Sequence, residues 1–128
     1  MARPETAKQR LGRQSERLAA RFLAGQGYTL EAVNVRVPGG ELDVVAREGG
    51  VLCFIEVRSR SSDAWGGPLA SIDAGKQRRF IRAVRWYLAR RGTPEVETRF
   101  DVVAITWRGL DPPRIELVRG AFEASGYF

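Results

Sequence analysis

Gly40-Glu41-Leu42-Asp43-Val44-Val45-Ala46 and Phe54-Ile55-Glu56-Val57-Arg58 are two β-prone stretches on either side of the dipeptide Gly49-Gly50. Apolar runs that flank a Gly-Gly pair are typical of a β-hairpin with a two-residue loop. Such a loop places Glu48 opposite Val51, and this pair sets the alignment of the two strands. The hairpin therefore decides which side chains of the two stretches meet.

Two acidic side chains meet in this alignment. Counting back along both strands places Asp43 opposite Glu56, and Glu41 opposite Arg58. Like charges directly opposed across a strand pair are destabilising, so the acids need a cation, a proton or a basic neighbour. A four-residue loop preserves this pairing, whereas a three-residue loop sends the acids to opposite faces. The inference of an acidic site therefore depends on the register.

The composition excludes several kinds of chemistry. The chain has no histidine and one cysteine, which rules out histidine-based triads, histidine-metal nucleases and a zinc cluster within one chain. Cys53 lies in an apolar strand, where a thiol usually behaves as a small buried hydrophobe. The net charge of +6 and the pI of about 10.4 favour a polyanionic partner such as nucleic acid.

A single domain over residues 1–128 is expected, because a chain of 128 residues with 44% hydrophobic content is about right for one compact core. No apolar run is long enough to span a bilayer, and residues 1–14 are polar rather than patterned as a signal peptide. We therefore expect a cytoplasmic protein that has no membrane partner.

The remaining sequence predicts two helices and three further strands. The first helix opens at Pro4-Glu5-Thr6 and ends at Gly25 to Gly27, and the second begins at Ser71 or Asp73 and ends at Gly92. The further strands are expected over residues 28–37, 99–107 and 114–119. The order α-β-β-β-α-β-β predicts an α/β fold, a mixed β-sheet flanked by helices, in which the strand-helix-strand unit is a right-handed crossover.

Both predicted helices have basic surfaces. We interpret the basic row of the first helix, which also contains Glu16, as a solvated face. The basic face of the second helix has two interpretations of about equal weight: it binds a phosphate backbone, or it is an ordinary solvated face. The scarcity of acids on this face favours a bound partner, because the basic side chains repel one another. The basic residues of the second helix are Lys76, Arg78, Arg79, Arg82, Arg85, Arg90 and Arg91.

Two residues outside the hairpin have alternative interpretations. Trp65, in a turn-rich stretch after the hairpin, either stacks on a nucleic-acid base or pins its loop onto the core. Asp101, in the predicted strand 99–107, either reaches the acidic site or pairs with an arginine from a helix, and we prefer the ion pair.

The second hairpin strand has the composition of a phosphate site. Side chains alternate along a strand, so Glu56 and Arg58 share a face. Hard carboxylate oxygens suit Mg²⁺ or Mn²⁺, which keep several water ligands and bind a phosphate oxygen at an open position. Such a metal could polarise the phosphate and acidify a bound water.

At these residues the chain resembles a known group. An aspartate, a turn and Glu-x-Lys on the next strand form the core of the PD-(D/E)xK nuclease superfamily. More narrowly, and over nearly its whole length, the chain resembles the uncharacterised YraN family. The resemblance rests on Glu16, Asn34 with Arg36, Gly40-Glu41-Leu42-Asp43, Phe54-Ile55-Glu56-Val57, Lys76-Gln77 and Arg99-Phe100-Asp101-Val102-Val103.

This resemblance implies a restriction-endonuclease-like core, similar to archaeal Holliday-junction resolvases. It implies metal binding by Asp43 and Glu56, a water-mediated ligand at Glu16, and a role for Gln77 in orienting substrate or a metal-bound water. The residue two after the glutamate is usually lysine in the superfamily, and here it is Arg58. Arginine can bind phosphate, but it stays protonated and cannot serve as a general base.

These features lead to one main hypothesis and two alternatives. The main one is a Mg²⁺- or Mn²⁺-dependent endonuclease for branched or single-stranded DNA, with DNA favoured over RNA. The alternatives are a catalytically inactive nucleic-acid-binding module and a protein-interaction subunit. A homodimer is left open, because resolvases need two active sites for symmetric cuts. The residues expected to follow the nucleic-acid backbone are Lys76, Arg78, Arg79 and Arg82.

Overall fold

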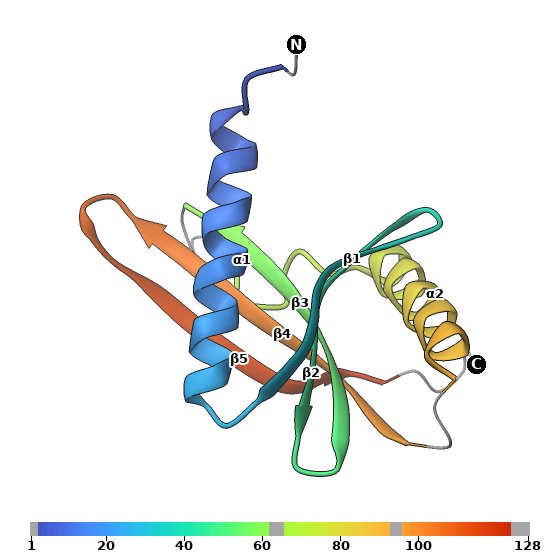
Figure 1. The fold of residues 1–128 in the computed structure, drawn as a ribbon. Helices are drawn as coiled ribbons and strands as arrows, with labels where there is room; N and C mark the ends of the chain where they lie inside the picture. Colours follow the sequence, from blue (N-terminus) through green and yellow to red (C-terminus); the bar gives the residue numbers. More distant parts are fainter. Residues whose placement is uncertain (1–2, 62–65, 93–95, 124–128) are drawn as a thin grey trace.

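The computed structural model describes residues 3–61, 66–92 and 96–123 (Figure 1). Within these residues, two helices and five strands follow one another in the predicted order. Their bounds are α1 (Ala7–Gly25), β1 (Thr29–Val37), β2 (Gly40–Glu48), β3 (Val51–Arg60), α2 (Ala74–Arg91), β4 (Glu97–Arg108) and β5 (Asp111–Phe122). Neither helix is long and apolar enough to cross a membrane.

Both helices begin at a capping side chain. The Thr6 hydroxyl accepts a hydrogen bond from the Gln9 N–H at 3.1 Å, and the Gln9 side chain accepts one from the Thr6 N–H at 2.9 Å. This capping box satisfies two N–H groups at the start of α1. Asp73 caps α2 by accepting from the Lys76 N–H at 2.8 Å, and Gly92 ends it with a left-handed φ of 64°.

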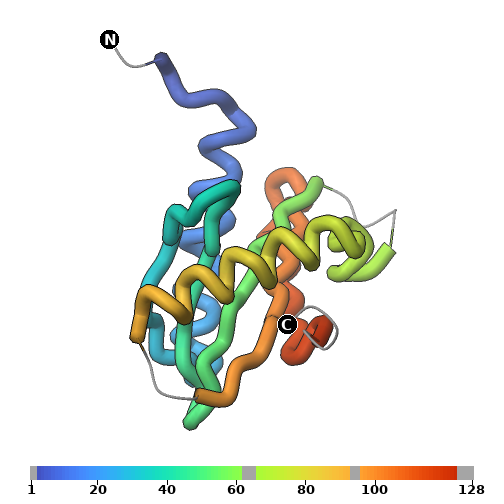
Figure 2. Tube along the Cα trace, turned by 90° about the vertical axis from the view of Figure 1, so that its right-hand side faces the viewer, coloured from blue at the N-terminus to red at the C-terminus, as the bar shows by residue number. Residues whose placement is uncertain are grey.

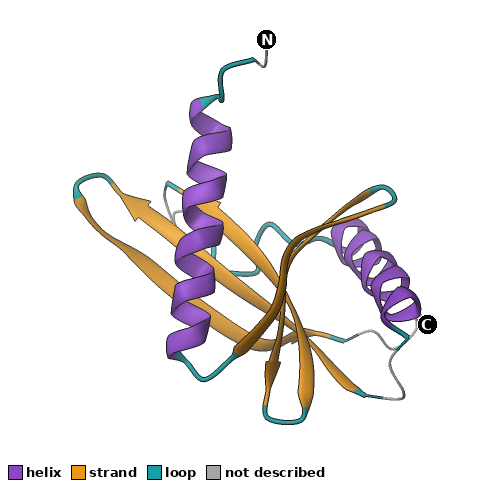
Figure 3. Cartoon of the chain, viewed as in Figure 1, coloured by secondary structure: helices purple, strands orange, loops and turns teal. Residues whose placement is uncertain are grey.

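The five strands form one mixed sheet in the order β1-β2-β3-β4-β5. The β3 and β4 strands are parallel and are joined through α2, whereas the other neighbouring strands are antiparallel. The helix α1 covers one face of this sheet and α2 covers the other (Figures 1, 2 and 3). The predicted mixed α/β fold is confirmed.

Each helix packs on its own hydrophobic cluster, and the sheet separates the two clusters. The cluster beneath α1 includes Ala19, Leu23, Tyr28, Val44, Ile55 and Ile105. The cluster beneath α2 includes Leu42, Phe54, Phe80, Ile81, Val84 and Phe100. The central strands are thus buried on both faces, as the nearly continuous apolar run in β4 predicts.

The predicted register of the β2–β3 hairpin is confirmed. Glu48 pairs with Val51 across the turn, in which Gly49 has a φ of 60°. The antiparallel ladder continues from this pair as far as Val44 opposite Ile55. It stops one step before the predicted opposition of the two acids, which therefore lie where the paired part of the hairpin ends.

The regular alternation of β2 breaks at the same level. Leu42 packs beneath α2 and Val44 beneath α1, although residues two apart in a regular strand share a face. On the neighbouring β1, Asn34 has a left-handed φ of 51°. Beyond the ladder, the Asp43 carboxylate accepts a hydrogen bond from the Val57 N–H at 2.9 Å. A side chain thus satisfies this backbone donor, and the bond fixes the position of the carboxylate.

Candidate metal centre and flanking basic residues

Three carboxylates gather where the β2–β3 ladder ends. Glu16 extends from α1, and Glu41 and Asp43 extend from β2. Each of the three residues offers one carboxylate oxygen, and these three oxygens all lie within 4.8 Å of one another. Glu16 and Asp43 are half-buried, whereas Glu41 is exposed. Hard oxygen ligands at this spacing can share a divalent cation such as Mg²⁺ or Mn²⁺.

Glu41 belongs to this cluster, although the sequence did not lead us to expect it as a metal ligand. We expected it opposite Arg58, but the ion pair of Arg58 among the described residues is with Glu56. The sequence did contain a signal for Glu41. The spacing Glu41-x-Asp43 on a strand puts two acids on one side over a short distance.

Glu56, on β3, lies next to Asp43. Burial of Asp43 and the negative charge of Glu56 raise the pKa of Asp43 to about 8, although the hydrogen bond from Val57 lowers it. Burial and the charge of Glu41 also raise the pKa of Glu16. A cation between these groups would favour their charged forms. The acids therefore repel one another, and a proton or a cation bound between them would relieve this repulsion.

Two basic side chains offset the charge of Glu56. The Lys76 ammonium, at the start of α2, is 3.6 Å from a Glu56 carboxylate oxygen, and the Arg58 guanidinium is 3.7 Å from the same atom. The Arg58 Nε also donates to the Ser71 hydroxyl at 2.9 Å. Arg58 thus presents a guanidinium that Ser71 holds in place, and α2 brings an ammonium to the same carboxylate.

The acids open onto two cavities. The first, of about 220 Å³, lies between the β1–β2 turn and α2, and its charged lining is Glu41, Glu56, Lys76, Arg79 and Arg82. The second, of about 240 Å³, lies against α1, and its polar lining is Arg13, Glu16, Arg17, Asn34 and Asp43. Each cavity combines carboxylates with basic side chains, so each can accept a group that carries both a metal and a phosphate.

The other predicted site residues lie near these cavities or outside the described structure. Arg78 faces a separate hollow of about 190 Å³ on α2, shared with Arg82. The Gln77 side-chain amide donates to the Ile72 carbonyl at 3.5 Å, so its described contact is to backbone and not to an acid. Trp65 lies outside the described residues.

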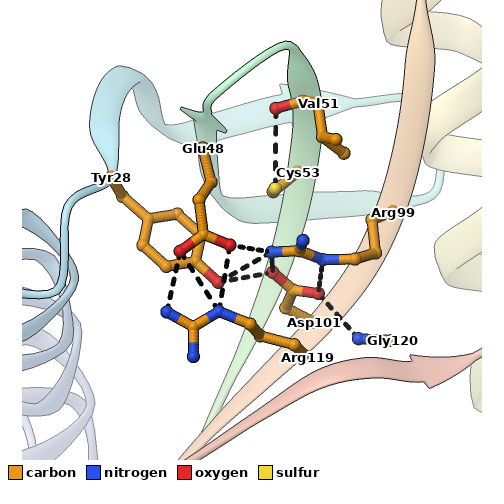
Figure 4. A network of polar contacts seen from close by, with 8 residues as sticks. All are labelled: Tyr28, Glu48, Val51, Cys53, Arg99, Asp101, Arg119 and Gly120. Carbon is orange, nitrogen blue, oxygen red and sulfur yellow. Dashed lines mark hydrogen bonds and ion pairs between the residues drawn. The ribbon is translucent and has the colours of Figure 1, made fainter.

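Asp101 does not belong to the acidic cluster. It is fully buried, and it accepts hydrogen bonds from the Tyr28 hydroxyl at 2.8 Å, the Arg99 Nε at 2.8 Å and the Gly120 N–H at 3.0 Å (Figure 4). The predicted ion pair with an arginine is present, but the prediction that a helix supplies this arginine is wrong. Arg99 lies two residues earlier on the same strand, where alternation places both side chains on one face.

The same network stabilises the turn end of the hairpin. Glu48 accepts from Arg99 at 2.7 Å and from Arg119 at 2.7 Å (Figure 4). Burial raises the pKa of the neighbouring Cys53 to about 11, so its thiol stays protonated as expected for a buried hydrophobe. The network joins β2, β4 and β5, and because Glu48 precedes the turn, it lies at the other end of β2 from the acidic cluster.

The fold and the cluster define a mixed α/β protein with a candidate site for a divalent metal. Residues 15–105 match the model of the uncharacterised protein family UPF0102, and the chain belongs to this family. This confirms the YraN-like membership that the sequence pattern predicted.

The family's proteins are similar to this chain over most of its length. A UPF0102 protein of Anaeromyxobacter sp. (strain Fw109-5) is 46% identical over 115 residues, which cover 90% of this chain and 86% of the relative. A UPF0102 protein of Desulfosudis oleivorans is 42% identical over 118 residues, which cover 92% and 94%. One of Geobacter sulfurreducens is 42% identical over 113 residues, which cover 88% of each chain.

Proposed function

We propose that this protein is a Mg²⁺- or Mn²⁺-dependent DNA endonuclease of the PD-(D/E)xK superfamily. The observation that supports it is the gathering of Glu16, Glu41 and Asp43 within 4.8 Å, with Glu56 beside Asp43. All of these donors are carboxylate oxygens, a set that suits Mg²⁺ and Mn²⁺ better than softer metals. The order and mixed sheet of the fold agree with a restriction-endonuclease-like core.

In this proposal the acids hold the metal. Asp43 and Glu56 are the main ligands, Glu16 contributes through water, and Glu41 is an additional ligand. The bound metal would polarise a phosphate oxygen and lower the pKa of water. The Val57 N–H binds one oxygen of the Asp43 carboxylate and so limits the rotation of this ligand.

The two cations at Glu56 hold the scissile phosphate. Arg58 is fixed by Ser71 and binds the phosphate oxygens with its planar guanidinium. Lys76 approaches the same carboxylate from α2 and supplies the ammonium charge that the superfamily obtains from a lysine at the position of Arg58. Both cations stabilise the negative charge that develops in phosphoryl transfer.

The substrate backbone continues along α2. Lys76, Arg79 and Arg82 line the cavity that contains Glu41 and Glu56, so neighbouring phosphates meet these cations first. Arg78 lies on the adjacent side of the helix and contacts a phosphate further along. Gln77 orients the substrate from the first turn of α2. Branched or single-stranded DNA is the proposed substrate.

A cleavage assay with matched variants tests the proposal. Labelled four-way junction, flap, single-stranded and duplex DNA are incubated with Mg²⁺, Mn²⁺ or a chelator. We expect metal-dependent cuts by the wild type and a loss of roughly 100-fold or more in Asp43→Asn. Asparagine keeps an oxygen for the Val57 N–H and removes the charge.

Glu97→Gln is the control, because it removes one carboxylate at an exposed position at the start of β4. It is expected to cut as the wild type does. Undiminished cleavage by purified Asp43→Asn would reject the proposed mechanism.

One observation favours a second candidate, an inactive nucleic-acid-binding module. Arg58 occupies the position at which the superfamily has lysine, and its guanidinium cannot act as a base. This candidate predicts a shifted DNA band in every metal condition, no cuts, and the same affinity in Asp43→Asn.

A further inference from the structure

A second row of basic side chains runs along α1. Arg13, Arg17 and Arg21 are spaced four residues apart, so they lie on one face of the helix, and all three are exposed. Arg13 pairs with Glu5. Neither Arg17 nor Arg21 forms an ion pair with another described residue. Like charges at this spacing repel one another, so the row is more favourable with an anion beside it.

This row leads directly to the acidic cluster. Arg13 and Arg17 line the same 240 Å³ cavity as Asp43. Further along the helix, Arg17 and Arg21 line a groove of about 490 Å³ that also contains Trp107 of β4. Arg17 lines both hollows, so the basic row leads from the acidic cluster to the groove between α1 and the β4–β5 hairpin.

The acids thus have cations on both sides. On the α2 side, Lys76, Arg79 and Arg82 border Glu41 and Glu56. On the α1 side, the basic row borders Asp43 and Glu16. The two helices lie on opposite faces of the sheet (Figure 2), and the cluster joins the two cavities because the oxygens of Glu16, Glu41 and Asp43 are within 4.8 Å.

A phosphodiester bond inside a strand has nucleotides on both sides. If its phosphate lies at the acids, the strand must leave the site in two directions. We infer that Arg17 and Arg21 form a second phosphate-binding surface on α1, which holds the part of the DNA strand on the far side of the scissile phosphate from α2. This inference rests on the proposed function and extends the DNA contact from one helix to two.

The test measures the salt dependence of DNA binding in three double variants. Each removes two positive charges: Arg17→Ala with Arg21→Ala, Lys76→Ala with Arg79→Ala, and Arg47→Ala with Arg108→Ala. Arg47 and Arg108 are exposed and line neither cavity, so the third variant is the charge-matched control. Fluorescence anisotropy of labelled single-stranded DNA is recorded in chelator over a series of NaCl concentrations.

We expect the α1 and α2 variants each to bind more weakly, with slopes of log K against log salt shallower by about 1.4, because each phosphate contact on single-stranded DNA contributes about 0.7. The control keeps the wild-type slope. A further variant, Arg17→Lys with Arg21→Lys, keeps both positive charges. We expect it to show the wild-type slope if the contacts are electrostatic, and this result would distinguish phosphate binding from a structural role of the arginines.

The outcomes distinguish this inference from the proposed function. An α1 variant that matches the control, while the α2 variant loses affinity, would overturn the α1 surface and leave the proposed endonuclease intact. Failure of the wild-type protein to bind the labelled strand would overturn the inference, and failure to cut every DNA substrate of the cleavage assay would overturn the proposed endonuclease.

Discussion

Asp43 is positioned by one backbone contact and destabilised by its acidic neighbours. The Val57 N–H binds one of its oxygens, whereas burial and the charge of Glu56 raise its pKa to about 8. A purely structural carboxylate would be better placed beside a cation, as Asp101 is beside Arg99. The protein therefore keeps half-buried carboxylates that repel one another at the end of the hairpin, which lowers its stability. Carboxylates with strongly shifted pKa values are common at functional sites.

Glu41 allows a test of metal binding that is independent of catalysis. We expect Glu41→Gln to bind Mn²⁺ about tenfold more weakly, a loss of ~1.4 kcal/mol, because it removes one of the three clustered carboxylates. The metal-free variant should be as stable as the wild type or slightly more stable, since Glu41 is exposed and repels Glu16. Titration calorimetry gives the affinity, and urea unfolding gives the stability. Equal Mn²⁺ affinity in both proteins would remove Glu41 from the site.

Glu48 gives a prediction for acid stability. Hydrogen bonds from Arg119 and Arg99 lower its pKa from the usual 4.5 to about 2. A carboxylate whose pKa is lowered on folding stabilises the protein above its unfolded pKa and loses this contribution as the pH falls toward 2. Glu48→Gln should therefore be less stable than the wild type at neutral pH, and the difference should shrink as the pH falls through 4.5 and vanish below about pH 2. Urea unfolding at both pH values checks this, and a pH-independent difference would contradict it.

Residue positions were predictable only where a local rule determined them. The Gly49-Gly50 turn determined the register as far as Val44 opposite Ile55. Asp43 and Glu56 are neighbours just beyond this last pair. The approach of Lys76 to Glu56 could not be predicted, because it depends on the angle at which α2 crosses the sheet. Sequence spacing contains no information on that angle.

At the scale of elements, the first turn of α2 links stability to the site. Asp73 caps this turn through the Lys76 N–H. We expect Asp73→Ala to lower the free energy of unfolding by about 1 kcal/mol, because the first N–H groups of the helix lose their acceptor. Asp73→Asn should change it much less, since asparagine also caps helices. Urea denaturation measures both, and equal losses in the two variants would show that the charge rather than the cap matters.

Two elements differ from expectation for identifiable reasons. The last strand was predicted over 114–119, but β5 begins at Asp111 and contains Pro112 and Pro113. Proline is tolerated there because β5 is an edge strand, and edge position cannot be recognised from the sequence alone. The left-handed φ of Asn34 and the break in alternation between Leu42 and Val44 were also unpredicted, since no glycine or proline marks either position in the sequence.

At the scale of the whole molecule, the sheet divides the core but not the site. Each face has its own helix and its own hydrophobic cluster. The acids lie where β2 and β3 cease to pair, so they are accessible from both faces. This arrangement explains how a small chain with a net charge of +6 can place basic residues on both sides of one cluster.

An opening on both sides predicts cleavage within a strand. A site closed on one side requires a free end, whereas a phosphate held between α1 and α2 can belong to a continuous chain. We therefore expect a covalently closed circle of single-stranded DNA to be cut in Mn²⁺, with the linear form appearing before shorter products. The Arg17→Ala and Arg21→Ala double variant should cut the circle more slowly, because it removes cations from one of the two proposed phosphate-binding surfaces. Degradation of a linear strand of the same sequence, with the circle left intact, would show that cleavage needs a free end.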